Sequence, residues 1–372
     1  MNKITMTSNL YQRGRVNLGN VTRMKKLFKK LQAGEKIVYG AIGGSITQGS
    51  AASSPEYRYV ERFASWLRTR YSATVDVVNA GIGASNSLFG AFRVEKDLLV
   101  HQPDLITIEY AVNDTTNPDT QAAYEALIRK CLTLSPDVAV ILIFTMNHSG
   151  ENKQHLQEPV GLHYQLPMIS YRDAVYPEIK QGSWTWEDIS PDTVHPNDLG
   201  HEMIADMLSR LTEDIAAADE QTESLPLPDY QFPGAAKYEN ARIIDAASMD
   251  LIAQSGWNQG PHKAGYTGWQ TDQPGAWLEV RFSGTYLAIG SQQYSGDFGR
   301  ASVSIDGKEP VVIEGYFTKA ENTVWAGGHT IISVINEQLP PGEHTLKLTI
   351  LPERHTNSNG YKFDIGYLLI AQ

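Results

Sequence analysis

Ile37–Gly49, with the sequence IVYGAIGGSITQG, is the clearest structural signal in this chain. Its apolar start is typical of a buried strand. Gly43 and Gly44 then allow the backbone to turn sharply and to approach another group closely. The next residue, Ser45, falls at the carboxyl end of the strand, where open α/β sheets carry their chemistry. A serine hydroxyl at this place becomes a nucleophile only where a neighbouring base takes its proton.

Strands and helices alternate through about the first 215 residues. Apolar runs typical of strands occupy 37–39, 75–79, 105–110, 138–144 and 166–170. Apolar stripes at helical spacing occupy 20–33, 60–67, 88–99, 120–134 and 199–215. This alternation requires crossover connections, so it predicts a parallel, flavodoxin-like sheet between two layers of helices. Residues 149–164 are polar and predict a loop.

The pattern changes near residue 218. Residues 216–228 are acidic and then punctuated by proline, as expected of a linker. Beyond them, alternating apolar residues in 278–282, 303–305 and 346–350 indicate antiparallel strands. We predict an α/β domain over 1–220 and an all-β sandwich or jelly-roll domain over 221–372.

Composition and charge limit the partners of the chain. Hydrophobic residues make up 41% and charged residues 20% of its 372 residues, as in globular proteins. The formal net charge of −11 argues against nucleic acids and anionic membranes as partners. Residues 1–20 show no signal-peptide pattern, so we expect a cytoplasmic protein. A homo-oligomer is compatible with the sequence. The single cysteine, Cys131, lies on an apolar helical stripe and is expected in the core.

The candidate base lies just before the last predicted helix of the α/β domain. Asp192 precedes His195 by three residues there. On a turn, this spacing lets the carboxylate bind Nδ1 of the imidazole while Nε2 faces a serine, which is how a serine nucleophile is activated. The loop that holds Asp192 and His195 and the turn that holds Ser45 are both expected at the carboxyl edge of the sheet.

Two further strand ends offer donors for an oxyanion. Residues 81–85 form a glycine-rich turn in which the backbone N–H of Gly83 or Ala84 could point into the crevice. The strand 105–110 is followed by Asn113, whose side-chain amide could do the same. Acyl transfer requires such donors around the tetrahedral intermediate.

These four blocks, in this order, resemble the SGNH (GDSL-like) hydrolase family. The resemblance implies Ser45 as nucleophile, His195 as general base and Asp192 as the residue that orients it. It also implies an oxyanion hole formed by the N–H of Ser45, a backbone N–H of Gly83 or Ala84, and the Asn113 amide. Neither a metal nor a cofactor is implied.

The sequence departs from the family pattern in three places. The serine block reads Gly-Gly-Ser-Ile instead of Gly-Asp-Ser-Leu, a form that resembles carbohydrate esterases of the acetylxylan type. Ala84 stands where the family usually has glycine, so the identity of the second donor is open. Ala111 replaces the family's glycine two residues before Asn113.

Each block also has a plainer interpretation when taken alone. Gly-Gly-Ser after a strand is more often a tight turn, Asp-x-x-His can be a helix cap with a surface histidine, and Asn-Asp is usually a turn. Their joint occurrence at consistent element ends favours a serine hydrolase. Residues 81–86 lack the third glycine of a dinucleotide-binding fingerprint, and no histidine cluster has metal-ligand spacing.

Several other residues are candidates for the substrate pocket. Gly44 and Asp114 adjoin the serine and asparagine blocks, and His148 follows the fourth strand. Trp184 and Trp186 precede the Asp-x-x-His block and either line the cleft or pack in the core. The same two alternatives, a sugar platform or a core, apply to four tryptophans of the second domain: Trp257, Trp269, Trp277 and Trp325.

The sequence thus favours an esterase that removes small acyl groups, chiefly acetyl, from xylo-oligosaccharides or related carbohydrates through an acyl-serine intermediate. One alternative is a hydrolase of lipids, thioesters or aryl esters. Another is a non-catalytic carbohydrate-binding protein. The natural ester, its position on the sugar and the role of the β domain do not follow from the sequence.

Overall fold

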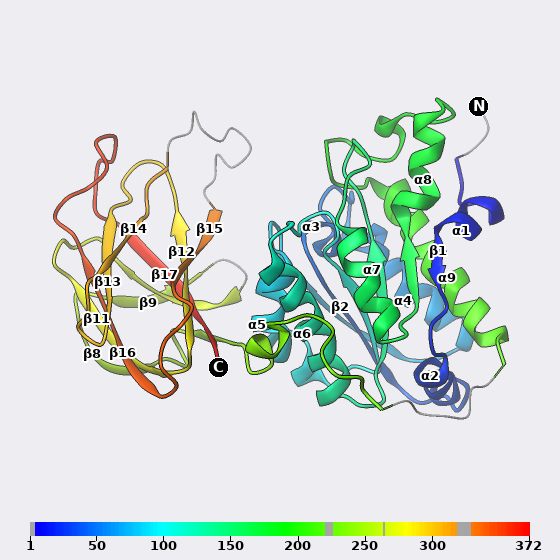
Figure 1. The fold of residues 1–372 in the computed structure, drawn as a ribbon. Helices are drawn as coiled ribbons and strands as arrows, with labels where there is room; N and C mark the ends of the chain where they lie inside the picture. The colour runs from blue at the N-terminus through cyan, green and yellow to red at the C-terminus, as the bar shows by residue number, and fades with distance from the viewer. Residues whose placement is uncertain (1–3, 220–225, 263–264, 318–328) are drawn as a thin grey trace. The chain divides into compact units, whose positions relative to one another are not determined.

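The strand predicted from Ile37 onward forms β2 (Ile37–Gly43) inside a six-stranded sheet (Figure 1). It pairs in parallel with β3 (Val75–Gly81) on one side and β4 (Leu105–Glu109) on the other. The computed structural model describes residues 4–219, 226–262, 265–317 and 329–372. Nearly all of β2 is buried, which explains its continuous apolar run.

The sheet continues through β5 (Ala139–Phe144) and β6 (Met168–Ser170) in the order β1-β6-β5-β4-β2-β3. Strands β2 to β6 are parallel, which confirms the predicted α/β sheet. The sequence does not predict β1 (Arg15–Asn17), which pairs antiparallel with β6 at the edge. Nor does it predict α1 (Ser8–Gly14) and α8 (Tyr171–Lys180), which are too short to give a clear apolar stripe.

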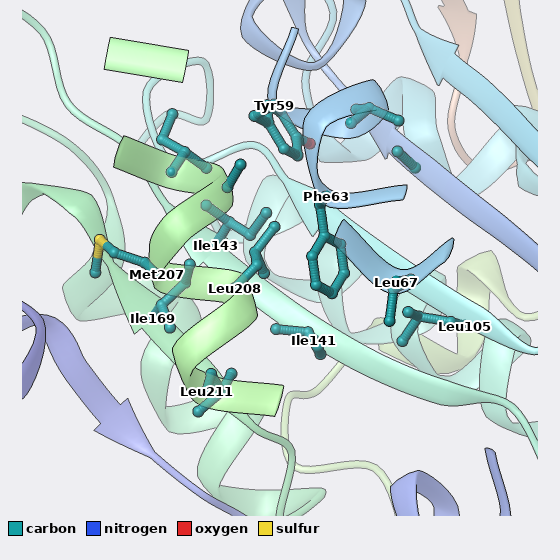
Figure 2. Close-up of a cluster of buried hydrophobic side chains, with 14 of the residues drawn as sticks. Tyr59, Phe63, Leu67, Leu105, Ile141, Ile143, Ile169, Met207, Leu208 and Leu211 are labelled. Atoms are coloured by element: carbon teal, nitrogen blue, oxygen red, sulfur yellow. The ribbon is translucent and has the colours of Figure 1, made fainter. Parts of the chain in front are cut away.

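One face of the sheet packs against α2 (Thr22–Gln32), α4 (Tyr59–Tyr71) and α9 (Asp198–Ala217). Figure 2 shows part of this cluster, in which Phe63 of α4 and Leu208 of α9 lie among side chains of the strands. Burying a leucine or phenylalanine contributes about 1.5–3 kcal/mol. This layer therefore holds α9, and with it the loop that precedes α9, against the sheet.

Three helices cover the opposite face: α5 (Ser87–Asp97), α6 (Pro118–Leu134) and α7 (Gln154–His163). On this side, a Cβ atom on Gly161 would lie 2.8 Å from the Leu142 side chain, so the glycine lets α7 approach β5 closely. The α/β/α layering predicted for this domain is thus confirmed. Of the helices in the described ranges, none is long and apolar enough to cross a membrane.

The loop predicted over 149–164 is wrong, because the structure forms α7 there despite Pro159. The buried face of α7 is partly polar, with Gln154 and Gln157 beside Val160 and Gly161. Gln154 Nε2 donates to Asp173 Oδ2 (2.9 Å), and Gln157 is almost fully buried. A helix whose buried side is stabilised by hydrogen bonds leaves no apolar stripe in the sequence.

The C-terminal unit consists of two antiparallel sheets with one hydrophobic core, which confirms the predicted all-β domain. One sheet has the order β15-β12-β17-β10-β9, with β7 also paired to β17, and the other has the order β14-β13-β16-β11-β8. The strands are β7 (Arg242–Asp245), β8 (Asp250–Ser255), β9 (Asn258–Pro261), β10 (Thr267–Thr271), β11 (Trp277–Ser283), β12 (Tyr286–Gln293), β13 (Arg300–Ile305), β14 (Val311–Glu314), β15 (His329–Asn336), β16 (Glu343–Ile350) and β17 (Phe363–Ala371).

The three tryptophans of this unit that the structure describes have different environments. Trp257 and Trp269 are buried in the core, as in the plainer of the two interpretations. Trp277 is half-buried, with the Lys347 ammonium 5.1 Å from its ring centroid. Trp325 lies outside the described residues.

The chain divides into two compact units, Met1–Glu239 and Asn240–Gln372. The boundary predicted at residue 220 lies outside the described residues. Residues beyond it still belong to the first unit, because the backbone N–H groups of Gln231 (2.7 Å) and Phe232 (2.8 Å) donate to the Glu125 carboxylate of α6. The proline-rich composition of 226–228 therefore does not separate the units.

Candidate active site

Ser45 is the first residue of α3 (Ser45–Gln48), a single helical turn that follows β2. Gly44 caps this turn, and its N–H donates to the carbonyl oxygen at the end of β4 (3.3 Å). Both glycines are required by close packing. A Cβ atom on Gly43 would lie 2.5 Å from the same carbonyl oxygen, and one on Gly44 would lie 2.6 Å from Asn113 Oδ1. Ser45 is thus held at the carboxyl end of β2, next to the turn that follows β4.

The structure brings Ser45, His195 and Asp192 into one hydrogen-bonded chain. His195 Nε2 lies 2.8 Å from Ser45 Oγ, and His195 Nδ1 lies 2.7 Å from Asp192 Oδ2. Asp192 Oδ1 accepts the backbone N–H groups of Val194 (2.8 Å) and His195 (2.7 Å). Burial by itself raises the pKa of Asp192, but the hydrogen bonds from His195 and Val194 bring that pKa below its usual value. An ionised Asp192 favours a proton on Nδ1, which leaves Nε2 as the acceptor beside Ser45 Oγ.

The loop that carries Asp192 and His195 is fastened from inside. The hydroxyl of the buried Ser190 lies 2.9 Å from the Asp192 carbonyl oxygen and 2.7 Å from that of His195. The Trp186 indole N–H donates to the Asp192 carbonyl oxygen as well. Trp186 therefore supports the acid and base through their backbone. Asn197 caps α9 directly after this loop, with Oδ1 accepting from Leu199 and Gly200.

The turn after β3 presents the second candidate oxyanion donor. The Gly83 N–H donates to Gln48 Oε1 (2.9 Å), so it is already engaged. Ala84 has φ +58°, in the left-handed region that favours glycine, and this matches the glycine of the family pattern at that position. Gly83 and Ala84 are alternatives for the second oxyanion donor. Because the Gly83 N–H is bonded to Gln48, the Ala84 N–H is the candidate for this role.

Asn113 supplies the third candidate donor. Its backbone N–H donates to the Tyr110 carbonyl oxygen (3.0 Å), which closes the turn after β4. Its side-chain Oδ1 is buried beside Gly44 and has no hydrogen-bond partner within the described residues. The NH₂ group is the other branch of the same amide. Together with the Ser45 N–H, which lies in the first turn of α3 and has no intrahelical acceptor, it can donate to an oxyanion.

A buried polar network under Ser45 is not predicted from the sequence. Glu109 at the end of β4 is fully buried, and its carboxylate accepts from Thr145 Oγ1 (2.6 Å) and Thr47 Oγ1 (3.2 Å). Burial raises the pKa of Glu109, although both threonine hydrogen bonds oppose this. Arg93 of α5, also fully buried, donates to the Gly43 carbonyl oxygen (3.1 Å). The sequence carries one sign of this network, because Glu109 is a charged residue within an otherwise apolar strand.

The remaining predicted pocket residues have different placements. Asp114 is buried, its two carboxylate oxygens accept the Ser87 N–H (2.8 Å) and Gln157 Nε2 (2.7 Å), and burial raises its pKa to about 7. It joins α5 to α7 from inside the domain. His148 is exposed, and its N–H donates to the carbonyl oxygen of Thr193 in the acid–base loop (2.9 Å).

Trp184 is not brought to the Ser45 turn. It is partly buried against the core of the first unit and lines a surface hollow with Leu10, Arg13 and Glu178. Its placement follows the core-packing alternative considered for it.

Within the described part of the chain, no three or more histidine, cysteine, aspartate and glutamate side chains are grouped so that they could hold a metal ion. The groups that this arrangement brings together for chemistry are a serine hydroxyl, an imidazole and a carboxylate, with three candidate hydrogen-bond donors around them.

The chain is similar to one protein family and to solved structures of two-domain esterases. Residues 41–203 match the model of the GDSL-like lipase/acylhydrolase family. No curated protein sequence matches the chain. The crystal structure of a two-domain esterase (CEX) active on acetylated mannans is similar over 97% of this chain and 98% of its own, with 27% identity and a TM-score of 0.85. A structure of such an esterase co-crystallised with mannopentaose is similar over the same shares, with 26% identity and a TM-score of 0.83.

Proposed function

We propose that this chain, a carboxylic ester hydrolase with a GDSL-like catalytic domain, removes acetyl groups from acetylated carbohydrates. The hydrogen-bonded chain from Ser45 through His195 to Asp192 supports the chemistry. The full-length similarity to an esterase active on acetylated mannans supports the substrate class.

The first half of the reaction acylates Ser45. His195 Nε2 accepts the hydroxyl proton as Ser45 Oγ attacks the acetyl carbonyl carbon, and Asp192 stabilises the imidazolium that forms. The carbonyl oxygen becomes an oxyanion and accepts hydrogen bonds from the N–H groups of Ser45 and Ala84 and from the Asn113 amide. His195 then returns the proton to the sugar oxygen, which leaves as a hydroxyl.

The second half releases acetate. A water molecule gives a proton to His195 Nε2 and attacks the acetyl-serine carbonyl carbon, so the same three donors stabilise a second oxyanion. Collapse of this intermediate breaks the bond to Ser45 Oγ, which recovers its proton from His195. The site thus needs one base for both halves.

The exact sugar is the finer part of the proposal. Acetylated mannan is the first substrate to test because of the full-length similarity, and acetylated xylan fragments follow from the Gly-Gly-Ser-Ile block. Both carry the same reacting group, an acetyl ester of a sugar hydroxyl. The acetyl ester is therefore the part of the substrate that the proposal depends on.

The test compares acetate release from acetylated mannan and acetylated xylan with p-nitrophenol release from acetate, butyrate and octanoate esters. We expect acetate esters to be preferred, and Ser45→Ala to lower kcat by about 10⁵-fold or more with an unchanged melting temperature. Full activity in Ser45→Ala would contradict the nucleophile. A preference for octanoate would favour a lipid hydrolase, and an inactive wild type would favour a binding protein.

A further inference from the structure

We propose that Gln48 is a positioning residue that sets the place of the second oxyanion donor, the Ala84 N–H; this inference rests on the proposed esterase function. Gln48 is the last residue of α3, the same helical turn that begins with Ser45. Its side chain is exposed, and its Oε1 accepts the Gly83 N–H at 2.9 Å. The nucleophile and the donor turn are thus joined by one side chain.

The base of the donor turn is already fastened to the serine segment. The Ile82 N–H donates to the Gly43 carbonyl oxygen (3.1 Å), and Asn79 Nδ2 donates to the Thr47 carbonyl oxygen (2.9 Å). Gly81 also lies so close to α3 that a Cβ atom on it would come within 2.6 Å of Gln48 Cα. These contacts hold the start of the turn and leave its tip to be held separately.

The tip consists of Gly83 and Ala84, and both are exposed. Of the two N–H groups of this tip, that of Gly83 donates to Gln48, and that of Ala84 has no acceptor among the described residues. The tip nevertheless lies close to the nucleophile, since a Cβ atom on Gly83 would be 3.8 Å from Ser45 Cβ. Ser85 closes the turn on its far side, because its N–H (3.3 Å) and its hydroxyl (2.7 Å) donate to the Ile82 carbonyl oxygen. The Gln48 hydrogen bond holds the side of the tip that lies near Ser45.

Backbone strain makes this anchor necessary. Ala84 has φ +58°, a conformation that alanine adopts only where the surroundings impose it. Loss of the Gln48 hydrogen bond leaves the turn closed by Ser85 but frees the Ile82–Gly83 peptide group to rotate, and this rotation shifts the neighbouring Ala84 N–H from the oxyanion position. Gln48 thus holds a donor that a glycine at position 84 would present without strain.

The first test is Gln48→Met, which keeps the length of the side chain and removes the acceptor. We expect kcat for p-nitrophenyl acetate to fall about 10- to 100-fold with KM within about threefold, because the lost interaction acts on the transition state. We also expect the Gly83 amide to exchange faster with deuterium in NMR spectra. The matched control is Gln32→Met, at an exposed glutamine that ends α2 in the same way, and it should keep the wild-type kcat.

A second variant separates positioning from a loss of stability. In Gln48→Glu, the carboxylate still accepts the Gly83 N–H, so this amide stays protected, but its negative charge lies next to the forming oxyanion. We expect the ratio of its kcat to that of wild type to be low at about pH 8 and to rise toward about pH 5 as the carboxylate takes up a proton. A purely structural role of Gln48 would leave this ratio independent of pH.

The outcomes distinguish this inference from the proposed function. If Ser45→Ala abolishes activity while Gln48→Met keeps the wild-type kcat, the esterase function stands and the role of Gln48 is wrong. The same conclusion follows if both Gln48 variants lose activity only in proportion to a lower melting temperature. If the wild type hydrolyses no acetyl ester, the proposed function fails, and this inference fails with it.

Discussion

Ser45 and His195 are 150 residues apart in the chain, yet Ser45 Oγ and His195 Nε2 are 2.8 Å apart. A third residue, Asp192, determines which nitrogen of His195 acts as the base. Asp192 accepts from Nδ1, so the unprotonated nitrogen, Nε2, faces the serine. The other carboxylate oxygen of Asp192 accepts two backbone N–H groups and so stabilises the loop. A substitution that keeps this oxygen can therefore change the orientation of His195 without disturbing the loop.

We predict that Asp192→Asn lowers kcat by about 10³- to 10⁴-fold while the melting temperature stays near that of wild type. The amide can still accept the backbone N–H groups, but it no longer selects the tautomer with the proton on Nδ1. Steady-state kinetics and thermal unfolding test this. The matched control is Asp188→Asn, which should keep the wild-type kcat. Asp188 is exposed, lies in the same loop and accepts the Thr185 N–H. Near-normal turnover in Asp192→Asn would mean that another group orients His195.

At the scale of elements, α9 and α4 are joined behind the active-site loop by His201. This side chain is buried, its Nδ1 accepts the Tyr59 N–H at the start of α4 (3.3 Å), and its Nε2 lies 3.4 Å from the Ser50 carbonyl oxygen. Burial lowers the pKa of His201 to about 4. A proton on Nδ1 would face the Tyr59 N–H, so the junction requires the neutral ring.

This junction predicts an acid-sensitive stability. Between the unfolded pKa of about 6.5 and the folded pKa of about 4, the unfolded chain binds more protons, so the free energy of unfolding falls as pH falls. The effect of His201 reaches at most about 3 kcal/mol at the acidic end of that range. Urea unfolding at pH 7 to pH 4.5 measures how the free energy of unfolding changes with pH. In His201→Asn this pH dependence should be weaker by the contribution of His201. The control His155→Asn, at an exposed residue of α7, should keep the wild-type slope. An unchanged slope in His201→Asn would contradict the prediction.

At the scale of the whole molecule, each of the two units has a hydrophobic core of its own. The core of the first unit includes Leu208 of α9, and that of the second includes Val303 of β13, both fully buried. Units with separate cores are expected to respond separately to a loss of packing.

We therefore predict two calorimetric transitions that respond to different substitutions. Leu208→Ala removes buried contacts worth about 2–5 kcal/mol and should lower only one transition. Val303→Ala removes less volume and should lower only the other. Differential scanning calorimetry with assignment by limited proteolysis distinguishes the two. A single transition lowered by both substitutions would show that the cores unfold together.

Much of the candidate site was readable from the sequence because its signals are local. The Gly-Gly-Ser turn, the Asp-x-x-His spacing and an asparagine after a strand each span a few residues, and the order of strands and helices predicts a common edge for them. Helix α7 shows the limit of this approach, since two of its buried residues are glutamines and its sequence pattern is that of a loop.

By itself the sequence determined the alternation of strands and helices in the first unit apart from β1, α1, α7 and α8, the change from a parallel α/β sheet to antiparallel strands, and Ser45, Asp192, His195 and Asn113 as candidates. Only the tertiary structure shows the hydrogen bond from Gly83 to Gln48, 35 residues earlier in the chain, and on this contact we propose Ala84 instead of Gly83 as the second donor. Likewise it placed Asp114 inside the domain as a support between α5 and α7. Such contacts join residues that are distant in the sequence, so no local pattern records them.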